Sequence, residues 1–299
     1  MRMGRTIDLH IHSSHSEDGE YPVEELFSMA RDAGIGAISI TDHDDIQSIR
    51  DAEGLPAEYG VNYIPGVEVT TVFPVDGSQQ HILGYFIRGD DHAFIATLRT
   101  IQALRSKVAA KRIEALRNIG FALNDTRISE MSAGRAPTAT SIMREIFLNE
   151  DNKDDPKLRD YFSGKNKINR LPAFYRAYFT EGKPAYVQFE SIPTRDGIAA
   201  ILSAGGIPVL AHPSFVKNRA WLDIIRDYGI QGIEAVSTYH SNEECRFFQE
   251  YAHTNGLCIT AGSDFHGQQS KPLVKMGGIS GNDYSLVESL IALHRTSKK

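Results

Sequence analysis

The chain has 299 residues, of which 41% are hydrophobic and 23% are charged. These values are ordinary for a globular protein, and they exclude a disordered or fibrous chain. The formal net charge of −6 argues against a broad basic surface for nucleic acid, although a small anionic substrate could still bind to a metal ion.

Neither the start of the chain nor its cysteines indicate secretion. Residues 1–12 contain no apolar run of the kind found in signal peptides, and no stretch reaches the roughly 20 apolar residues of a membrane span. Cys245 and Cys258 are too far apart for a CxxC motif. We therefore expect reduced thiols and a cytoplasmic location.

The first third of the chain predicts alternating strands and helices. Apolar and polar residues alternate over residues 6–12, which is typical of a strand. A helix is expected over residues 24–33, where Gly34 ends it. Further strands are expected over residues 37–41, over 63–73 with a break at Pro65–Gly66, and over 81–87.

The middle of the chain reads differently. Apolar residues recur at helical spacing over residues 93–119, and Gly120 follows as a stop signal. A second helix is expected over residues 138–148, followed by a solvated loop or helix end over 149–160. The basic excess over residues 164–183 indicates either a solvated face or a lining for an anionic substrate.

The last third returns to alternating strands and helices. Strands are expected over residues 208–211, 232–236 and 258–261, and helices over 196–204, 219–228 and 242–255. Repeated strand–helix units predict a parallel sheet or a barrel. The middle block then reads as a helical insertion, which gives a barrel domain over residues 1–92 and 190–299 and an insertion domain over 93–189.

Histidines and carboxylates gather at or just beyond the ends of the expected strands, the face on which barrel enzymes place their active sites. These residues are Asp8, His10, His12, Asp42, His43, Asp44, Glu68, His81, His212, Asp264 and His266. A structural role is expected instead for His15, His92, His253 and His294.

The spacing of these residues favours metal binding. His10 and His12 are two apart on a strand, so both side chains point to one face, and Asp264 and His266 repeat this spacing. Such a pair could bind one metal ion or two adjacent ions. Imidazole and carboxylate ligands suit zinc, manganese or iron. We expect Asp8 and Asp42 to orient the ligand rings as hydrogen-bond acceptors.

The motifs IDLHIH, SITDHD, PGVEV, VLAHP and GSDFHG, in this order and spacing, resemble those of the polymerase and histidinol phosphatase (PHP) family. The resemblance covers about residues 6–87 and 205–266. It implies an α/β fold, a distorted (β/α)7 barrel, with a cluster of two or three divalent metal ions (manganese, zinc or iron). It also implies an enzyme that hydrolyses phosphate esters.

The same resemblance implies a set of metal ligands that are all histidines or carboxylates. They are His10, His12, Glu68 and Asp264 for the first metal, Glu68, His81 and His212 for the second, and Asp18, His43 and His266 for the third. Glu68 would bridge two metals. In the variable loop that carries Asp18, His15 or Glu17 could take its place.

A narrower resemblance comes from YFTEGKPAYV at residues 178–187 and from GIEAVSTYHS at residues 232–241, which begins with the sixth expected strand. Both are similar to a subgroup that acts on nucleoside monophosphates and 3′,5′-bisphosphates, with relatives that trim short RNA. That similarity implies phosphate-binding roles for Arg135, Lys183 and His240. The subgroup's Arg-x-His is not kept, because Arg135 is followed by Ala136 and Pro137.

The resulting hypothesis is release of phosphate from a small phosphomonoester, such as AMP or a 3′,5′-bisphosphate, by attack of a metal-bridging hydroxide. Asp264 would act as a metal ligand at the reacting centre, and His240 could protonate the leaving oxygen. Three alternatives remain: a phosphodiesterase acting on cyclic or short oligonucleotide diesters, a histidinol phosphatase, and a non-catalytic metal-binding module. The expected partner is a small phosphorylated substrate, without membrane or extended DNA binding.

Overall fold

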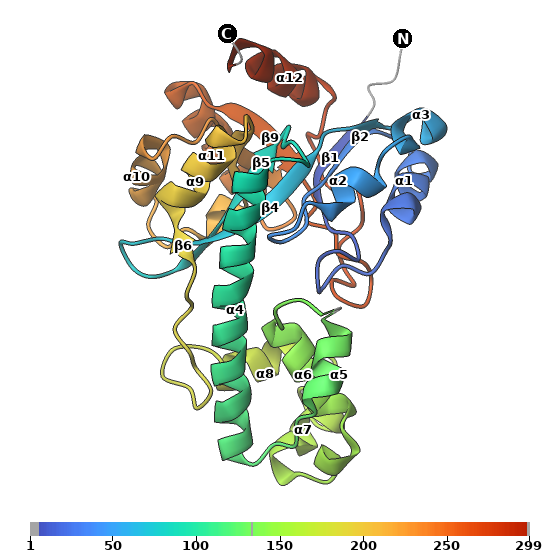
Figure 1. The fold of residues 1–299 in the computed structure, drawn as a ribbon, viewed down its shortest axis with the longest axis vertical. Helices are drawn as coiled ribbons and strands as arrows, with labels where there is room; N and C mark the ends of the chain where they lie inside the picture. The colour runs from blue at the N-terminus through green and yellow to red at the C-terminus, as the bar shows by residue number, and fades with distance from the viewer. Residues whose placement is uncertain (1–5, 133, 298–299) are drawn as a thin grey trace. The chain divides into compact units, whose positions relative to one another are not determined.

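The structure is a computed structural model, and it describes residues 6–132 and 134–297. The chain divides into two compact units. One unit comprises Met1–Arg99 and Ile192–Lys299 and is called the α/β unit here. The other comprises Thr100–Ser191 and is called the helical unit. Figure 1 shows the elements of both units in chain order from blue to red.

A three-stranded parallel sheet opens the α/β unit in the order β1–β2–β3. Its strands are β1 (Thr6–Ile11), β2 (Ile35–Ile40) and β3 (Asn62–Tyr63). Every residue of β2 is buried. The isoleucine-rich sequence IGAISI suits such a position, because a strand covered on both faces carries apolar residues on both sides.

A six-stranded sheet completes the unit in the order β6–β4–β5–β7–β8–β9. Its strands are β6 (Ile192–Pro193), β4 (Gly66–Val72), β5 (Gln79–Tyr85), β7 (Ile207–Leu210), β8 (Gly232–Ser237) and β9 (Cys258–Gly262). Only β5 runs antiparallel to its neighbours among the pairs described.

The direction of β5 corrects the expectation of an all-parallel arrangement. The connection from β4 to β5 is a tight turn in which Phe73 N donates to Ser78 O at 2.8 Å and Gly77 adopts a positive φ of 71°. A parallel connection needs a crossover of a dozen or more residues. The short turn therefore forces the two strands to run in opposite directions.

The helices of the α/β unit alternate with its strands along the chain. They are α1 (Val23–Asp32), α2 (Gln47–Asp51), α3 (Leu55–Tyr59), α9 (Thr194–Ser203), α10 (Trp221–Asp227), α11 (Asn242–Asn255) and α12 (Ser285–Ser297). α1 buries Val23, Leu26, Phe27 and Ala30, the helical spacing of a single apolar face. A capping box of Ser241 and Glu244 begins α11.

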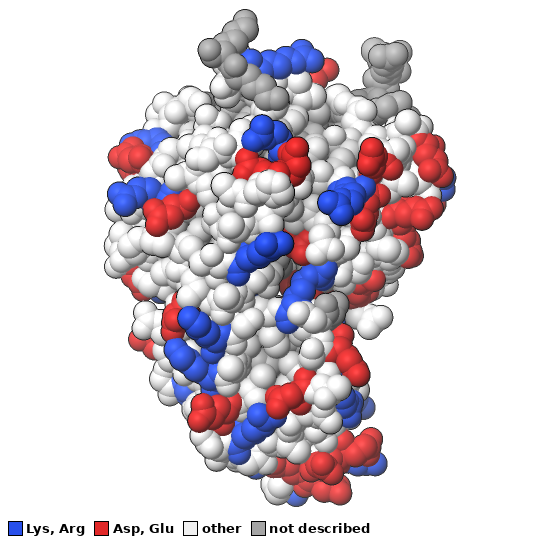
Figure 2. Space-filling view, in the orientation of Figure 1, with Lys and Arg blue, Asp and Glu red and all other residues white. Residues whose placement is uncertain are grey.

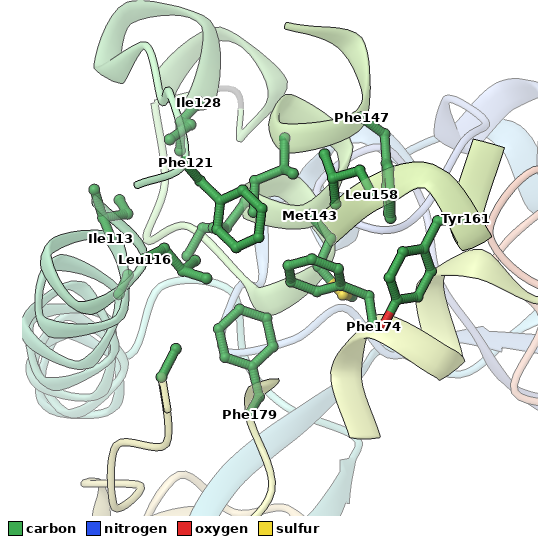
Figure 3. Close-up of a cluster of buried hydrophobic side chains, with 14 residues drawn as sticks. Ile113, Leu116, Phe121, Ile128, Met143, Phe147, Leu158, Tyr161, Phe174 and Phe179 are labelled. Atoms are coloured by element: carbon green, nitrogen blue, oxygen red, sulfur yellow. The ribbon is translucent and has the colours of Figure 1, made fainter. Parts of the chain in front are cut away.

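The helical unit contains the greater part of α4 (His92–Ile119), the long green helix of Figure 1. The unit continues through α5 (Asp125–Met131), α6 (Ala139–Leu148), α7 (Arg159–Phe162) and α8 (Arg170–Tyr178). Its own hydrophobic core is drawn in Figure 3. Phe174 lies in that core, with its ring 4.2 Å from Tyr178 and 5.5 Å from Phe147.

The mixed α/β fold expected from the sequence is confirmed. The break at Pro65–Gly66 separates β3 from β4 as expected. Residues 149–160 are more ordered than expected, because 3-10 turns at Glu150–Asn152 and Pro156–Leu158 follow α6. α8 and α12 were not expected from the sequence. Within the described ranges, no helix is both long enough and apolar enough to cross a membrane.

Candidate metal centre

The site begins on β1, where a strand delivers two histidines to one place. His10 and His12 are two residues apart, both are buried, and their ring centroids lie 5.2 Å from each other. Side chains at this spacing on a strand share one face. The sequence IDLHIH therefore places two imidazoles on the inner side of β1.

Glu68 on β4 brings its carboxylate to this pair. Its Oε2 lies 3.3 Å from Nε2 of His10, 3.3 Å from Nε2 of His12 and 3.0 Å from Nδ1 of His43. Residue pairing between His43 and Glu68, reinforced by a hydrogen bond from Asp44 N to Glu68 O, fixes this register. One carboxylate oxygen thus faces three imidazole nitrogens.

The other oxygen of Glu68 faces a different pair of histidines. Its Oε1 lies 2.9 Å from Nδ1 of His81 on β5 and 3.0 Å from Nε2 of His212, which follows β7. Because its two oxygens face separate groups of imidazoles, Glu68 could be shared between two neighbouring cations.

Asp264 reaches the pair on β1 from the end of β9. Its Oδ1 lies 3.2 Å from Nε2 of His10 and 3.1 Å from Nε2 of His12. Asp264 has a positive φ of 56°, and its N–H donates to His10 O at 2.8 Å. A left-handed backbone at a residue other than glycine is strained, and such strain concentrates at functional sites.

A further group forms beside the loop after β1. Asp18 Oδ2 lies 3.4 Å from Nε2 of His266 and 4.0 Å from Nε2 of His43. The sequence left His15 as an alternative, but its Nε2 pairs with Asp51 Oδ2 at 2.6 Å. Asp18 thus lies beside His266 and His43, whereas His15 pairs with Asp51, and Glu17 stays an alternative for this loop.

The arrangement leaves buried polar atoms without hydrogen-bond partners among the described residues. These atoms are His10 Nε2, His12 Nε2, His43 Nδ1, Glu68 Oε2, Asp18 Oδ1 and Asp264 Oδ1. A buried polar atom without a partner costs free energy, so such a concentration calls for an additional bound group. Divalent cations fit, because imidazole nitrogens and carboxylate oxygens are the donors they accept.

Three combinations of these residues bring candidate ligand atoms within 4.8 Å of one another. They are His10, His12, Glu68 and Asp264; His12, Asp18, His43 and His266; and His43, Glu68 and His81. The first combination contains the same residues as the first metal position expected from the sequence. The residues of the expected set thus lie together at one place in the α/β unit.

The electrostatics of the cluster favour positive charge. Burial alone would raise the pKa of Glu68, but His81, His10 and His43 outweigh burial and hold this pKa well below its usual range. Burial alone would likewise lower the pKa of His12, yet Asp264 and Glu68 raise it to about 9. Bound cations would supply this charge in place of protons, because metal ligands must be deprotonated.

The ring of His10 is oriented by a residue that sequence reasoning missed. His10 Nδ1 donates to Glu234 Oε1 at 2.9 Å, and Glu234 Oε2 accepts from His212 N at 2.8 Å. Glu234 lies on β8 and is fully buried. An acidic residue in the middle of the apolar strand sequence GIEAV was the available signal.

The roles expected for Asp8 and Asp42 need correction. Asp8 accepts from Ser263 N at 2.8 Å and from Gly277 N at 2.7 Å, so it ties backbone segments together rather than orienting a ring. Asp42 acts indirectly, because its Oδ1 accepts from Ser16 Oγ at 3.0 Å, and that hydroxyl contacts His12 Nδ1 at 2.9 Å. In both cases the aspartate accepts a hydrogen bond from a serine, where we had expected it to accept one from a histidine ring.

A cavity of about 290 Å³ opens beside the cluster. It is lined by Asp18, His43, Glu68, Gln79, Gln80, His81, His212, Phe215, Tyr239, Asp264, His266 and Lys271. Phe215, Tyr239 and Lys271 were not anticipated from the sequence. The rings of Phe215 and Tyr239 lie 4.9 Å apart, and Lys271 hydrogen bonds both Tyr239 and Asp264.

The residues expected to bind phosphate are not among the residues that line this cavity. His240 does not line the cavity; its Nδ1 contacts Ala235 O at 3.1 Å, and its ring lies 4.8 Å from that of Phe248. Burial lowers the pKa of His240. Arg135 and Lys183 belong to the helical unit.

Comparison with known proteins gives consistent matches. A family model described as the PHP domain matches residues 8–134. The chain is 30% identical over 271 residues to a 3′,5′-nucleoside bisphosphate phosphatase of Chromobacterium violaceum, with 87% of each chain covered. It is 26% identical over 261 residues to a phosphoribosyl 1,2-cyclic phosphate 1,2-diphosphodiesterase of Eggerthella lenta, covering 87% of this chain and 94% of that relative.

Among solved structures, an amidohydrolase from Chromobacterium violaceum with bound sulfate and no metal has a TM-score of 0.79. It is 26% identical to this chain, and the match covers 96% of both chains. The similarity thus extends over nearly the whole chain in both sequence and fold.

Proposed function

This chain belongs to the PHP domain family, and we propose that its buried histidines and carboxylates hold two or three divalent metal ions for hydrolysis of a small phosphomonoester. The chain is a metal-dependent phosphoesterase. The observation that carries the proposed site is the convergence of His10, His12, Glu68 and Asp264, whose facing atoms are buried and without hydrogen-bond partners among the described residues.

The proposed ligands keep the assignment that the family resemblance implies, and the first set coincides with one combination of converging ligand atoms. The assignment is His10, His12, Glu68 and Asp264 for one ion, Glu68, His81 and His212 for a second, and Asp18, His43 and His266 for a third. Bound metal ions lower the pKa of water toward neutrality and offset negative charge on phosphate. The mixture of imidazole and carboxylate donors suits manganese, zinc or iron.

The protein's own residues would prepare the site in two ways. Glu234 accepts from Nδ1 of His10, which leaves Nε2 as the nitrogen that faces Glu68 and Asp264. Glu68 and His10 are buried, so few water molecules surround their ligand atoms. Electrostatic interactions strengthen in such a dry setting, so charge on a bound phosphate is stabilised by groups that are already in place.

We propose a nucleotide as substrate, either AMP or a 3′,5′-bisphosphate. The Chromobacterium violaceum relative, which is a 3′,5′-nucleoside bisphosphate phosphatase, supports this choice. Arg135, Lys183 and His240 remain the proposed phosphate-binding residues from the earlier resemblance. Figure 2 shows basic and acidic side chains intermixed over the face it displays, which favours a small substrate over extended DNA.

A phosphodiesterase acting on cyclic or short oligonucleotide diesters is the second candidate. The Eggerthella lenta relative, a phosphoribosyl 1,2-cyclic phosphate 1,2-diphosphodiesterase, favours it. The same metal cluster could serve both reactions, because both transfer a phosphoryl group whose non-bridging oxygens carry negative charge that cations stabilise. The ratio of kcat/KM for a monoester and its matched diester separates the two candidates.

The deciding experiment is a phosphate-release screen of nucleotides, sugar phosphates and histidinol phosphate with added manganese. We expect the highest kcat/KM with a nucleotide monoester or bisphosphate. His10→Ala and Asp264→Ala should lose activity while keeping their circular dichroism spectra. A folded, metal-loaded wild-type protein that is inert on every ester would instead indicate a non-catalytic metal-binding module.

We further propose that the two sheets close into a distorted (β/α)7 barrel. Ile11 pairs with Phe265 just beyond β9, and His12 N donates to Phe265 O at 2.8 Å. On the other side, His43 pairs with Glu68 of β4, and Glu68 N donates to Asp42 O at 3.1 Å. These two bridges connect the sheets at both ends and support closure, because a closed barrel leaves no unpaired strand edge.

A further inference from the structure

Lys271 occupies an unusual position at the cavity. It is the one lysine or arginine among the described residues that line the cavity, which otherwise has histidines, carboxylates, amides and aromatic rings. Its side chain is 26% exposed, so the ammonium group is neither deeply buried nor free in solvent. Any anion that enters this cavity would meet this ammonium group.

The hydrogen bonds of Lys271 leave one donor for a ligand. Its Nζ donates to Asp264 Oδ2 and to the hydroxyl of Tyr239, the latter at 2.6 Å. Tyr239 in turn donates to Asp264 Oδ2 at 2.6 Å. An ammonium group carries three hydrogens. The third has no acceptor among the described residues, on a side chain that lines the cavity.

Asp264 relates this ammonium to the metal ligands. Its Oδ2 binds Lys271, while its Oδ1 faces Nε2 of His10 and of His12 at 3.2 and 3.1 Å. The two oxygens of one carboxylate therefore connect the ammonium group to the proposed metal position. A phosphate bound at the proposed metal position would lie close to Lys271, because only the carboxylate of Asp264 separates that position from the ammonium group.

The backbone holds Lys271 ready for this contact. Lys271 N donates to Gly267 O at 3.0 Å, and Val274 N donates to Lys271 O at 3.0 Å. Its Nζ also lies 5.2 Å from the centre of the Tyr239 ring. A donor fixed in advance needs little reorganisation when charge arrives, which makes it an effective partner for an anion.

We propose that Lys271 is a phosphate-binding residue, whose third N–H donates to a non-bridging oxygen of the substrate's phosphate while Tyr239 and Asp264 hold the ammonium in place. This inference rests on the proposed phosphoesterase function. It adds a cation in the segment after β9 to the other proposed phosphate-binding residues, which are His240 of the α/β unit and Arg135 and Lys183 of the helical unit. The ligand class is a phosphate ester, or inorganic phosphate as the released product.

The test compares Lys271→Met with Lys275→Met at saturating manganese. Both variants lose one positive charge from the same segment, but Lys275 is exposed and does not line the cavity. Steady-state kinetics would give kcat, KM and the inhibition constant of inorganic phosphate, and metal content would be measured on the same samples. Calorimetric titration of inorganic phosphate into the metal-loaded protein adds a readout that does not require turnover.

For Lys271→Met we expect phosphate binding to weaken about tenfold to a hundredfold, the range of a charge-assisted hydrogen bond. KM should rise with it, and metal content should match the wild type. Lys275→Met should behave as the wild type. Lys271→Arg keeps the charge and should retain part of the phosphate affinity. If Lys271→Met does not fold, Lys271→Gln replaces it.

Two outcomes would overturn the inference. One is that metal-saturated Lys271→Met binds phosphate as tightly as the wild type, whether or not its metal affinity falls. Lys271 would then only support Asp264. The other is an equal effect of Lys275→Met, which would make the effect one of net charge. Failure of the wild type to hydrolyse any ester would count against the proposed function, while the calorimetric titration would still decide the role of Lys271.

Discussion

Glu68 holds a central position because its two oxygens face different imidazoles. Some of these histidines are themselves held by hydrogen bonds to other residues. Glu234 is one such residue. It accepts from Nδ1 of His10 and from the backbone N–H of His212, so a single buried carboxylate on β8 contacts two proposed ligands. Partners of this kind set the tautomer and orientation of a ligand histidine.

We predict that Glu234→Gln weakens metal binding by about tenfold to a hundredfold, the usual effect of removing a partner behind a ligand. Glutamine keeps the shape of the side chain but lacks the charge that favours a proton on Nδ1 of His10. Metal affinity would be measured by competition with a chelator of known affinity. Glu244→Gln, in the capping box at the start of α11, is the control, and equal affinities in the two variants would contradict the prediction.

For single residues, the sequence predicted which histidines and carboxylates form the cluster, but not which residues form hydrogen bonds to them. The sequence alone indicated a cluster, because His10 and His12 are two residues apart and histidines and acids recur at strand ends. Lys271 could not be found in this way, because it lies in an irregular segment and its contact with Asp264 depends on how that segment folds back. Glu234 stands out in the sequence as an acid within an apolar strand, but nothing in the sequence indicates that its partner is His10.

Strand β9 shows how an element can be shaped by the site it carries. A methyl group added at Gly262 would lie 2.2 Å from Cβ of His10 and 2.6 Å from Glu234 Oε1. Such distances are too short for contact between non-bonded atoms. β9 can therefore lie against both β1 and the carboxylate of Glu234 only because residue 262 has no side chain.

We predict that Gly262→Ala lowers metal affinity and destabilises the fold by about 1–3 kcal/mol, the usual cost of forcing an extra group into a packed interior. The measurements are metal content and the urea midpoint of unfolding. Gly256→Ala is the matched control, because its added methyl group meets no atom within 4 Å, although the positive φ of 66° carries its own strain. This control should lose stability but keep metal, and loss of metal in both variants would refute the explanation.

The elements most readily predicted were those with a clear period. Residues 242–255 were expected as a helix, and α11 has the same limits, because Ser241 caps its start and Gly256 ends it with a positive φ of 66°. β5 was located, but its direction was not predicted, since the turn before it determines direction. α8 was missed because Pro172 and two arginines, Arg170 and Arg176, interrupt its apolar pattern.

At the scale of the whole molecule, bound metal should contribute to stability. The proposed ligands come from several strands and loops that are distant in sequence, so metal binds only after the α/β unit has folded. A ligand present at a hundred times its Kd stabilises the folded state by about 2.7 kcal/mol. For a unit of about 200 residues, such as the α/β unit that holds the site, that corresponds to roughly 5–10 °C in Tm.

We therefore predict that chelation lowers Tm by roughly 5–10 °C and that added manganese restores it. Differential scanning calorimetry before and after chelation gives the shift, with metal content measured on the same samples. The His10→Ala variant should start from the lower Tm and respond little to chelation. A chelated protein that has lost its metal but keeps its Tm would show that the cluster is not coupled to folding.

Among the described residues the helical unit has a hydrophobic cluster of its own, which leads to a prediction about where stability is lost. The core of the helical unit runs from Ala109 to Ala185, and none of its residues belongs to the clusters beneath the sheets. Figure 3 shows Phe174 pointing into this core among aromatic neighbours. Replacing such a buried aromatic residue by alanine typically costs about 3–5 kcal/mol.

Phe174→Ala should therefore loosen the helical unit while leaving the metal centre intact. Hydrogen exchange followed by mass spectrometry should show faster exchange over residues 100–191, with metal content unchanged. Ile168→Ala, at a side chain that is 94% exposed, should have an effect within about 0.5 kcal/mol, because surface substitutions rarely exceed that. If Phe174→Ala instead released metal, the stability of the two cores would have to be coupled.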